Sequence, residues 1–244
     1  MNPKLSLIIP IYNAEKFIIK SLEQISQWIN DVKFEVEVII VNDGSSDDSE
    51  FIVAKYIKNY NLNLTFISYR NNKGKGYAVK QGMIRAKGDF RIFTDADIPY
   101  GFAVMDEMIY YLDFKEFDVC IGNRRSIHSI YFAKVTFIRK LSSFVFTGIV
   151  SRFVVTGIKD TQCGLKGFRG EVANRLFNIS VVNGFGFDIE VLYLCYKNEF
   201  DIKRIPVTFG GNDESTISLV KDSIRMLKDV LALPFRYHLT NKYK

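Results

Sequence analysis

With 244 residues, of which 48% are hydrophobic and 25% charged, the chain is long enough to bury a substantial core and gives no indication of disorder. Its formal net charge of +6 predicts an anionic partner such as a nucleotide, a nucleic acid or an acidic membrane surface. The three cysteines form no CxxC pair, which argues against a disulfide framework or a structural zinc site and is typical of a reducing cytosol.

The hydropathy pattern argues against two kinds of membrane targeting. The opening stretch MNPKLSLIIP has no small-residue cleavage site after its apolar run, so we expect no signal peptide. No run approaches the roughly 18 apolar residues that span a bilayer. The nearest, residues 142–158, contains Arg152. The sequence therefore predicts a protein that is soluble or lies on a membrane surface.

Short apolar runs and amphipathic stretches alternate through the first half of the chain. In the first predicted helix, Ile18, Leu22, Ile25 and Ile29 share one face. Repeated strand–helix–strand units predict an α/β fold with a parallel sheet and helices on both faces. Strands are expected at residues 5–9, 36–41, 64–68, 90–94 and 118–122, and helices at residues 14–29, from about Asp47, at 77–86 and at 104–112.

The second half is less regular. Residues 127–157 are rich in Phe, Val and Ile with basic residues interspersed, and a polar turn, KDTQCG, follows. We expect a helix after GFGFDIE, a strand at residues 202–207 and an amphipathic helix at residues 217–231. The apolar face of that last helix would consist of Ile217, Val220, Ile224, Leu227 and Leu231.

Polar side chains follow three of the predicted strands at the points where the strands end. Ligands of an open parallel sheet bind at the carboxyl ends of its strands, so we expect these side chains to meet in one crevice. An acidic pair alone is more often a solvated turn, but the other polar strand ends favour a site. The residues are Pro10, Tyr12 and Asn13 after the first strand, Asn42 and Asp43 after the second, and Asp95 and Asp97 after the fourth.

Asp95 and Asp97 stand one residue apart at the end of an apolar strand. Carboxylates this close raise each other's pKa unless a cation bridges them. Mg²⁺ prefers oxygen ligands and is often shared between carboxylates and substrate phosphates. The pair therefore predicts a metal that also binds a diphosphate. Asp43 suits a hydroxyl or amide of a nucleoside, and Lys75 adds positive charge.

Two other nucleotide-binding patterns do not fit the sequence. A Rossmann dehydrogenase needs a glycine-rich turn after the first strand, where this chain has PIYNAE, and the P-loop pattern GxxxxGK[ST] does not occur. The segment GKGYAVKQG lacks GxGxxG spacing. Its glycines either let the backbone approach a ligand or serve only as turn residues.

Five motifs carry a resemblance to a known family. They are LSLIIPIYNAEKFI, VNDGSSDDS, NKGKGYAVKQGMIRAKGDF, FTDADIP and DTQCGLKGFR, and the likeness runs from residue 5 to about residue 231. The chain resembles the family 2 glycosyltransferases of the GT-A fold. Within that family it is most similar to the polyprenyl- or dolichyl-phosphate glycosyltransferases, particularly the dolichyl-phosphate glucosyltransferase type. The resemblance implies one domain over residues 1–244 with a Rossmann-like, mostly parallel sheet.

The resemblance also implies that residues of these motifs bind the donor. Asp95 and Asp97 would be the DxD pair that holds Mg²⁺ or Mn²⁺, with Asp97 the more direct ligand. The donor-binding residues would be Pro10, Tyr12, Glu15, Asp43, Gly74, Lys75, Asp95, Ala96 and Asp97.

On the acceptor side, the resemblance implies that Arg124, Arg139 and Gln162 hold a phosphate, for which guanidinium groups are suited. Asp160 lies in the DTQCG turn near the sugar and acceptor. Asp188 and Glu190 would support that region or act as a base, so Asp97, Asp160, Asp188 and Glu190 are the catalytic candidates.

The implied reaction is an inverting sugar transfer from a nucleotide diphosphate sugar to a polyprenyl phosphate. An anionic phosphate oxygen attacks with little help from a base, whereas a hydroxyl acceptor requires one. The likeness around DTQCG favours UDP-glucose as donor, and UDP-N-acetylhexosamine or GDP-mannose remain open. The runner-up is a soluble family 2 enzyme that adds sugar to a glycan or another hydroxyl acceptor.

Three positions depart from the family pattern. Asn42 replaces one of two acids after the second strand, and Pro99 stands where the mannosyltransferases have a glutamine ligand. Thr216 stands where relatives carry Lys or Arg, so a cation expected near the diphosphate is missing.

The apolar, basic segment at residues 127–157 has two readings, buried core or an amphipathic, acceptor-side element at a membrane surface. The C-terminal FRYHLTNKYK likewise either touches anionic lipid or is a solvated tail. We expect a cytoplasmic protein attached peripherally to the cytoplasmic face of a membrane. A noncatalytic nucleic-acid-binding module is the other class considered, but the basic residues are scattered and two acids at the site would repel phosphates, so we expect no nucleic-acid partner.

Overall fold

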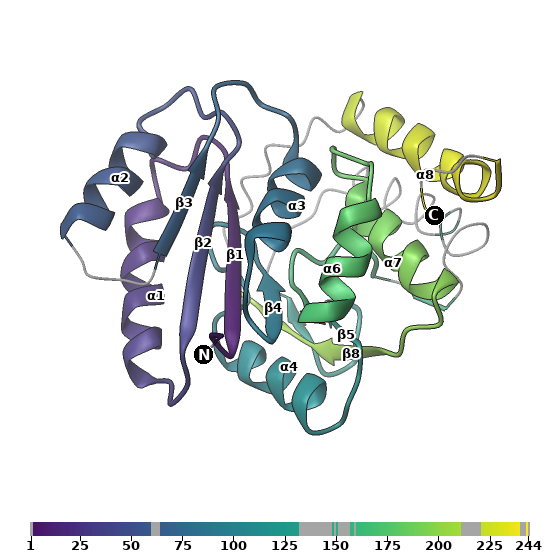
Figure 1. Ribbon diagram of the computed structural model, residues 1–244, viewed down its shortest axis with the longest axis horizontal. Coiled ribbons are helices and arrows are strands. Elements are labelled where there is room, and N and C mark those ends of the chain that lie inside the picture. Colours follow the sequence, from purple (N-terminus) through teal and green to yellow (C-terminus); the bar gives the residue numbers. More distant parts are fainter. Residues whose placement is uncertain are drawn as a thin grey trace.

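The computed structural model describes residues 2–59, 64–131, 148, 150, 157–158, 160–210, 221–239 and 243. At its centre lies a seven-stranded sheet with the order β3-β2-β1-β4-β7-β5-β8 (Figure 1). Every neighbouring pair is parallel except the two pairs that involve β7. The strands are β1 (Leu5–Ile11), β2 (Val36–Asn42), β3 (Leu64–Ser68), β4 (Phe90–Phe93), β5 (Val119–Asn123), β7 (Lys166–Arg169) and β8 (Ile202–Pro206).

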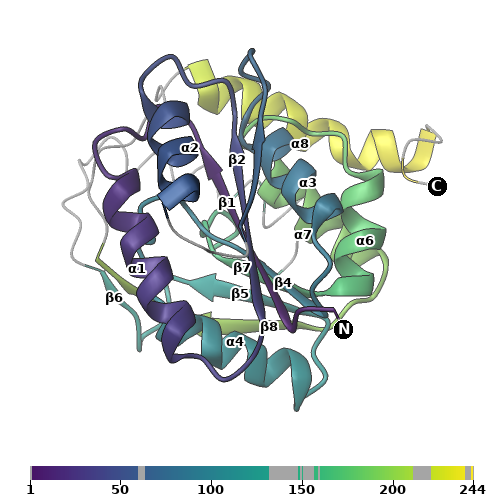
Figure 2. The same cartoon turned by 60° about the vertical axis from the view of Figure 1, so that its left-hand side comes forward.

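Helices cover both faces of the sheet, as predicted (Figures 1 and 2). Successive residues of β1 point to opposite faces, so Ile8 belongs to one core cluster and Leu7 and Ile9 to the other. The first face is covered by α3 (Lys75–Arg85), α6 (Gly170–Ile179), α7 (Phe187–Lys197) and α8 (Lys221–Leu239), and the second by α1 (Ile18–Asp31), α2 (Ser49–Asn59) and α4 (Ala103–Asp113).

The first half of the chain forms the predicted elements, with ends that differ by a few residues. All seven residues of β1 are buried, as strands covered on both faces require. In α1, Ile18, Leu22 and Ile25 are buried on the predicted face, and Ile29 packs against the same cluster. These elements confirm the α/β class and place the strand ends at one edge of the sheet.

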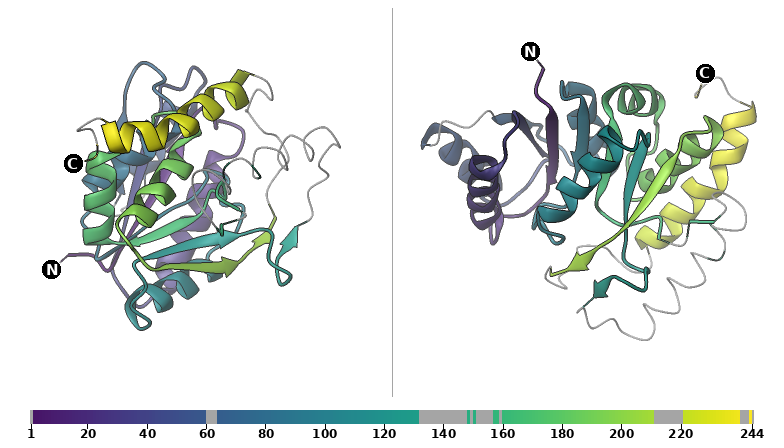
Figure 3. Two further views of the ribbon diagram at one scale, coloured as in Figure 1. Left: turned by 90° about the vertical axis from the view of Figure 1, so that its right-hand side faces the viewer. Right: turned by 90° about the horizontal axis from the view of Figure 1, so that it is seen from below.

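Four elements among the described residues of the second half were not predicted. β7 runs antiparallel between β4 and β5, so the sheet is mixed rather than wholly parallel. Its four residues, KGFR, include two cations and show no apolar run that would reveal a buried strand. The following helix α6 buries Val172, Leu176 and Phe177 against the sheet. Two residues each form β6 (Ile130–Tyr131) and β9 (Thr208–Phe209), which pair in parallel beside the main sheet (Figure 3).

The face of the last helix differs from the prediction. Val230 and Leu233 of α8 are fully buried, whereas Leu231 is 50% exposed. Met226 and Tyr237 also pack against the core. The buried face of α8 therefore contains these residues with Val230 and Leu233, and not the predicted Leu231. Ile217 and Val220 lie outside the described residues, as does most of the 127–157 segment. Within the described part of the chain, no helix is both long and apolar enough to cross a membrane.

Candidate active site

The loops after β1 and β2 are tied together by hydrogen bonds. The Asn13 backbone N–H donates to Ser45 Oγ at 2.9 Å, and Asn13 Oδ1 accepts from the Ser46 N–H at 2.8 Å. Asn13 adopts a φ of 50°, a conformation that Asn tolerates better than most residues. Beside it, Tyr12 is 43% exposed and Glu15 accepts a bond from the Asp48 N–H. The first two strand ends therefore form one rim, as predicted.

Pro10 fits inside this central sheet because of where β4 ends. β4 stops at Phe93, which pairs with Ile8, so Pro10 lies beyond the last β1–β4 pair. Proline has no N–H to donate, but no residue of β4 pairs with Pro10, so the β1–β4 ladder loses no hydrogen bond. The buried Pro10 ring lies near the carboxyl end of β1. Its contact with the donor stays a prediction.

Asp43 fixes the loop that precedes α3. Its buried carboxylate accepts hydrogen bonds from the backbone N–H groups of Lys73 and Gly74, each at 2.8 Å. Gly74 has a φ of 104°, and a Cβ there would stand 2.4 Å from the Asn183 carbonyl oxygen, so the loop needs glycine. Asp43 thus positions Lys75, and its predicted contact with the nucleoside stays a prediction.

The acid pair after β4 is only partly neutralised by the protein. Lys75 Nζ forms an ion pair with Asp95. Burial lowers the pKa of Lys75, but Asp95 and Asp188 together outweigh this and raise it, so the amine is charged. Asp97 forms no ion pair with any described residue. Burial, together with the charge of Asp95, raises the pKa of Asp97.

The DTQCG turn lies directly against the acid pair. A Cβ on Gly164 would stand 1.9 Å from Asp95 Oδ2, so only glycine allows the turn to approach this closely. The approach follows from topology, because an antiparallel β7 begins at the edge of the sheet where β4 ends. The turn also supplies Asp160, and so brings an acceptor-side candidate to the end of β4.

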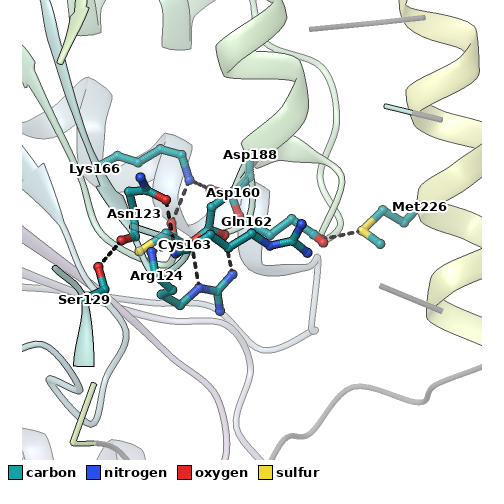
Figure 4. A network of polar contacts seen from close by, with 10 residues as sticks. Asn123, Arg124, Ser129, Asp160, Gln162, Cys163, Lys166, Asp188 and Met226 are labelled. Carbon is teal, nitrogen blue, oxygen red and sulfur yellow. Dashed lines mark hydrogen bonds and ion pairs between the residues drawn. The ribbon is translucent and has the colours of Figure 1, made fainter. Parts of the chain in front are cut away.

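Asp160 and Arg124 form a two-point ion pair (Figure 4). Asp160 accepts from Arg124 Nη2 at 2.7 Å, from Nε at 3.0 Å and from the backbone N–H at 2.7 Å. Burial raises the pKa of Asp160, but the bonds and charge of Arg124 outweigh it and lower the pKa overall. Arg124 is therefore held in one orientation. Arg139 lies outside the described residues, and Gln162 directs its side-chain amide to Met226 Sδ at 2.9 Å (Figure 4).

A second ion pair, Lys166 with Asp188, is buried beneath the turn (Figure 4). Neither side chain exceeds 7% exposure, and Lys166 Nζ also donates to the Cys163 carbonyl at 2.7 Å. Burial raises the pKa of Asp188 even though Lys166 opposes the shift. Lys166 is not among the predicted site residues, since nothing in KGFR marks its first residue as buried. The pair fixes the turn from below.

Glu190 is engaged by backbone and side-chain donors. Its carboxylate accepts from the N–H groups of Val181 and Val182 at 3.0 and 2.9 Å, and from the Tyr243 hydroxyl at 2.5 Å. Burial raises the pKa of Glu190. The carboxylate thereby holds the loop that packs on the start of α3, where Asn183 accepts the N–H of Tyr77.

A pocket of about 120 Å³ opens beside Lys75. One wall comes from the loop before α3 and the loop before α7, and the other from the first turns of α8. No local pattern places the first turns of α8 at this pocket, because contact between these segments depends on the tertiary fold. The lining residues are Asn72, Gly74, Lys75, Gly184, Phe185, Arg225, Met226 and Asp229.

Comparison with known proteins decides the class of this site. A family model described as glycosyl transferase family 2 matches residues 6–177. The chain belongs to this family. It is similar to proteins named dolichyl-phosphate beta-glucosyltransferase: that of Dictyostelium discoideum is 33% identical, with 98% of this chain and 76% of the relative covered. Those of Saccharomyces cerevisiae and Homo sapiens are 31% and 29% identical, with 96% of this chain and 75% and 76% of the relatives covered.

Solved structures confirm the GT-A fold of this glycosyltransferase. Glucosyl-3-phosphoglycerate synthase from Mycobacterium tuberculosis, in complex with Mn²⁺, UDP and glucosyl-3-phosphoglycerate, superposes with a TM-score of 0.69 at 16% identity. The alignment covers 96% of this chain and 79% of the synthase. The predicted fold is therefore confirmed, and the family match confirms the predicted enzyme class.

The acid pair of the glycosyltransferase fits a divalent metal. Two half-buried carboxylates stand together, and the cation that pairs with them among the described residues is Lys75, on Asp95. Burial and then the charge of Asp95 raise the pKa of Asp97, and a bound cation would offset both effects. In the described part of the chain, no group of three or more His, Cys, Asp or Glu side chains could hold a metal. A metal on this pair would need further oxygen ligands, which a donor diphosphate and water would supply.

Proposed function

We propose that this glycosyltransferase moves glucose from UDP-glucose to a polyprenyl phosphate such as dolichyl phosphate, with inversion at the anomeric carbon. The observation that carries the proposal is the acid pair after β4, held between Lys75 and Gly164. Its substrates are inferred from relatives that share the name dolichyl-phosphate beta-glucosyltransferase and align with 96–98% of this chain.

On the donor side, Asp97 and Asp95 would hold Mg²⁺ or Mn²⁺. When bound, the metal would neutralise the diphosphate as it departs. Lys75 contributes in two ways, since it orients Asp95 and adds a positive charge at the edge of the pocket. Tyr12 and Glu15 form the rim on which we place the nucleoside, with Asp43 fixing the adjacent loop.

On the acceptor side, a phosphate oxygen would form a bond to the anomeric carbon while the bond from that carbon to the diphosphate oxygen breaks. No proton has to be removed from an anionic phosphate, so no general base is needed. We assign Arg124 to orienting that phosphate, because Asp160 fixes its guanidinium plane while 29% of the side chain stays exposed. Arg139 and Gln162 remain proposed partners.

A hydroxyl acceptor is not favoured, because it requires a carboxylate free to take a proton. The three candidates for that role are all engaged by described residues. Asp160 pairs with Arg124, Asp188 with Lys166, and Glu190 with two backbone N–H groups. These interactions support positioning roles for the three carboxylates and leave Asp97 as the acid available to a ligand. A polyprenyl acceptor also supports peripheral attachment at the cytoplasmic face of a membrane.

The test is calorimetric titration of UDP-glucose and GDP-mannose, with and without Mn²⁺. We expect metal-dependent binding of UDP-glucose and an affinity loss of at least about 100-fold in Asp97→Asn, since even groups that only support metal ligands are worth 10–100-fold. Asp31→Asn is the matched control, because this exposed carboxylate ends α1 far from the carboxyl ends of the strands.

A transfer assay with a short-chain polyprenyl phosphate completes the experiment. Glucosylated lipid phosphate should form with the wild-type protein and with Asp31→Asn, but not with Asp97→Asn. Binding of neither donor under any metal condition would overturn the proposal, and transfer only to a hydroxyl acceptor would overturn its acceptor half.

A further inference from the structure

A row of large apolar side chains faces outward on α8. Leu231, Phe235 and Leu239 are 50%, 63% and 68% exposed. They are spaced by four residues, so they lie on one side of the helix along successive turns. Scattered single exposed apolar residues are ordinary on a protein surface, whereas a continuous row is a mark of an interaction surface.

The row is held rigidly because the opposite side of α8 is packed. Val230 and Leu233 are fully buried, and Tyr237 makes an edge-to-face contact with Tyr193 of α7 at 5.8 Å between ring centroids. Lys197 of α7 also lies 5.5 Å from the Tyr237 ring. Figure 1 shows α8 at the outer edge of the molecule, so its outward side is covered by no other described element.

The charges on the outward side of α8 are positive. Arg225 and Lys228 are exposed and precede Leu231 by six and three residues, which places them along the same side. Among the described side chains of α8 the acid is Asp229, which is half-buried and forms an ion pair with Arg236 at 3.5 Å. The helix thus presents cations in its first turns and apolar side chains beyond them.

The same helix reaches the candidate active site. Arg225, Met226 and Asp229 line the pocket that contains Lys75. A surface in contact with the outward side of α8 would therefore lie next to the mouth of this pocket. A combination of cations and large apolar groups on one helix suits a bilayer of anionic lipids, whose headgroups attract the cations while the apolar groups enter the interface.

We propose that the outward side of α8, from Arg225 to Leu239, docks on an anionic lipid bilayer. The inference rests on the proposed function in one respect, since a lipid phosphate acceptor has to reach the candidate active site from a membrane. Docking through α8 would set the mouth of the pocket at the headgroups, where the phosphate of such an acceptor lies.

The experiment measures sedimentation with vesicles of phosphatidylcholine alone and of phosphatidylcholine with 30% phosphatidylglycerol, a composition chosen to give roughly the surface charge that attracts basic segments. The wild-type protein should bind the anionic vesicles. A triple variant, Leu231→Ser with Phe235→Ser and Leu239→Ser, should partition about 100-fold less into the anionic vesicles. Each substitution removes an apolar side chain whose complete burial would be worth about 1.5–3 kcal/mol, and the vesicle interface buries only part of it. Lys228→Glu should lower binding roughly tenfold on anionic vesicles only.

Phe51→Ser is the matched control. Phe51 is 67% exposed on α2, at the opposite end of the molecule from α8 (Figure 1), and its replacement should leave vesicle binding unchanged. Calorimetry with UDP-glucose on the triple variant should match the wild type, which shows that the variant is folded. Vesicle binding by the wild type without any donor binding would refute the proposed function while leaving the docking surface intact.

Three outcomes would overturn the docking surface. In the first, the wild-type protein binds neither kind of vesicle. In the second, the triple variant binds anionic vesicles as strongly as the wild type does. In the third, the wild type does not bind vesicles but self-associates, and the triple substitution abolishes this self-association. The last would identify the outward side of α8 as a contact between two copies of the chain.

Discussion

Each carboxylate of the candidate site has a distinct set of neighbours. Asp95, Asp160 and Asp188 each pair with one cation, which is Lys75, Arg124 or Lys166 respectively. Burying a charge is costly unless it is paired and hydrogen-bonded, so these pairs allow the site to lie inside the fold. Asp97 is the exception among the four, since no described residue forms an ion pair with it, and it is therefore the carboxylate that we assign most directly to the metal.

Replacing Asp160 by Asn should destabilise the protein in a pH-dependent way. The pKa of Asp160 is lowered in the folded state, so its contribution is complete above the unfolded value of 3.8 and is lost as the pH falls through the lower, folded value. At pH 7 we expect a cost of about 2 kcal/mol, below the 3–5 kcal/mol typical of fully buried pairs, because Arg124 is partly exposed to solvent.

Urea unfolding from pH 7 down to pH 2 measures this prediction. The free-energy difference between wild type and Asp160→Asn should shrink once the pH falls below 3.8, where the unfolded chain binds a proton at Asp160, until the folded protein is protonated as well. A difference that stays constant over this range would show that Asp160 does not act through its charge.

Among the secondary-structure elements, β7 has the greatest effect on the site. Because it is antiparallel to its neighbour, its first residues and the turn before it meet the last residues of β4. The result is the contact between Gly164 and Asp95, which joins a donor-side motif to an acceptor-side one.

Gly164→Ala should impair metal-dependent donor binding through this contact. An added methyl would meet the Asp95 carboxylate at 1.9 Å, so either the turn or the carboxylate has to move. We expect at least about a tenfold loss of UDP-glucose affinity in the presence of Mn²⁺, since displacements near 1 Å at a reacting centre can cost 100-fold in rate. In Gly186→Ala, the control, the methyl would have an ordinary contact at 3.4 Å and affinity should be retained. Equal affinity in both variants would contradict the role of the contact.

The sequence predicts those elements whose own residues specify them. The first half of the sheet is predictable because continuous apolar strands alternate with helices such as α1, whose apolar spacing is regular. The polar strand ends are predictable for the same reason, since parallel topology brings them together.

The remaining features depend on contacts between distant segments. β7 is a strand because β4 and β5 flank it, and Lys166 is buried because Asp188 meets it. Similarly, the buried side of α8 is set by α7, which selects Val230 and Leu233 instead of the predicted row through Leu231. No local pattern in these segments carries that information.

For the whole molecule, the two halves of the chain share the site. Asp43 and Asp95 come from the first half, and Gly164, Asp188 and Arg225 come from the second. A ligand bound among them stabilises the folded state of both halves together, because the unfolded chain offers no such arrangement.

Nucleotide binding should therefore raise the melting temperature of the entire protein in one step. At a concentration of UDP about 100 times its Kd, linkage predicts a stabilisation of about 2.7 kcal/mol. For a chain of this size, that corresponds to a shift of about 5–10 °C. Calorimetric melting with UDP and Mn²⁺ measures the shift, which should be lost in Asp97→Asn. An equal shift without Mn²⁺ would show that the acid pair does not couple metal to nucleotide.

The position of β7 has a consequence for synthesis of the protein on the ribosome. Strands β1 to β4, which end in the rim and the acid pair, emerge first, but the turn that lies on Asp95 emerges about 70 residues later, since growth is from the N-terminus. Until then the central edge of the growing sheet, along β4, has no partner, and an unpaired edge is a template for pairing with other chains. The strand that brings the DTQCG turn onto the acid pair is thus also the one that closes this edge, so a nascent chain joins the two motifs and loses its exposed edge in one step.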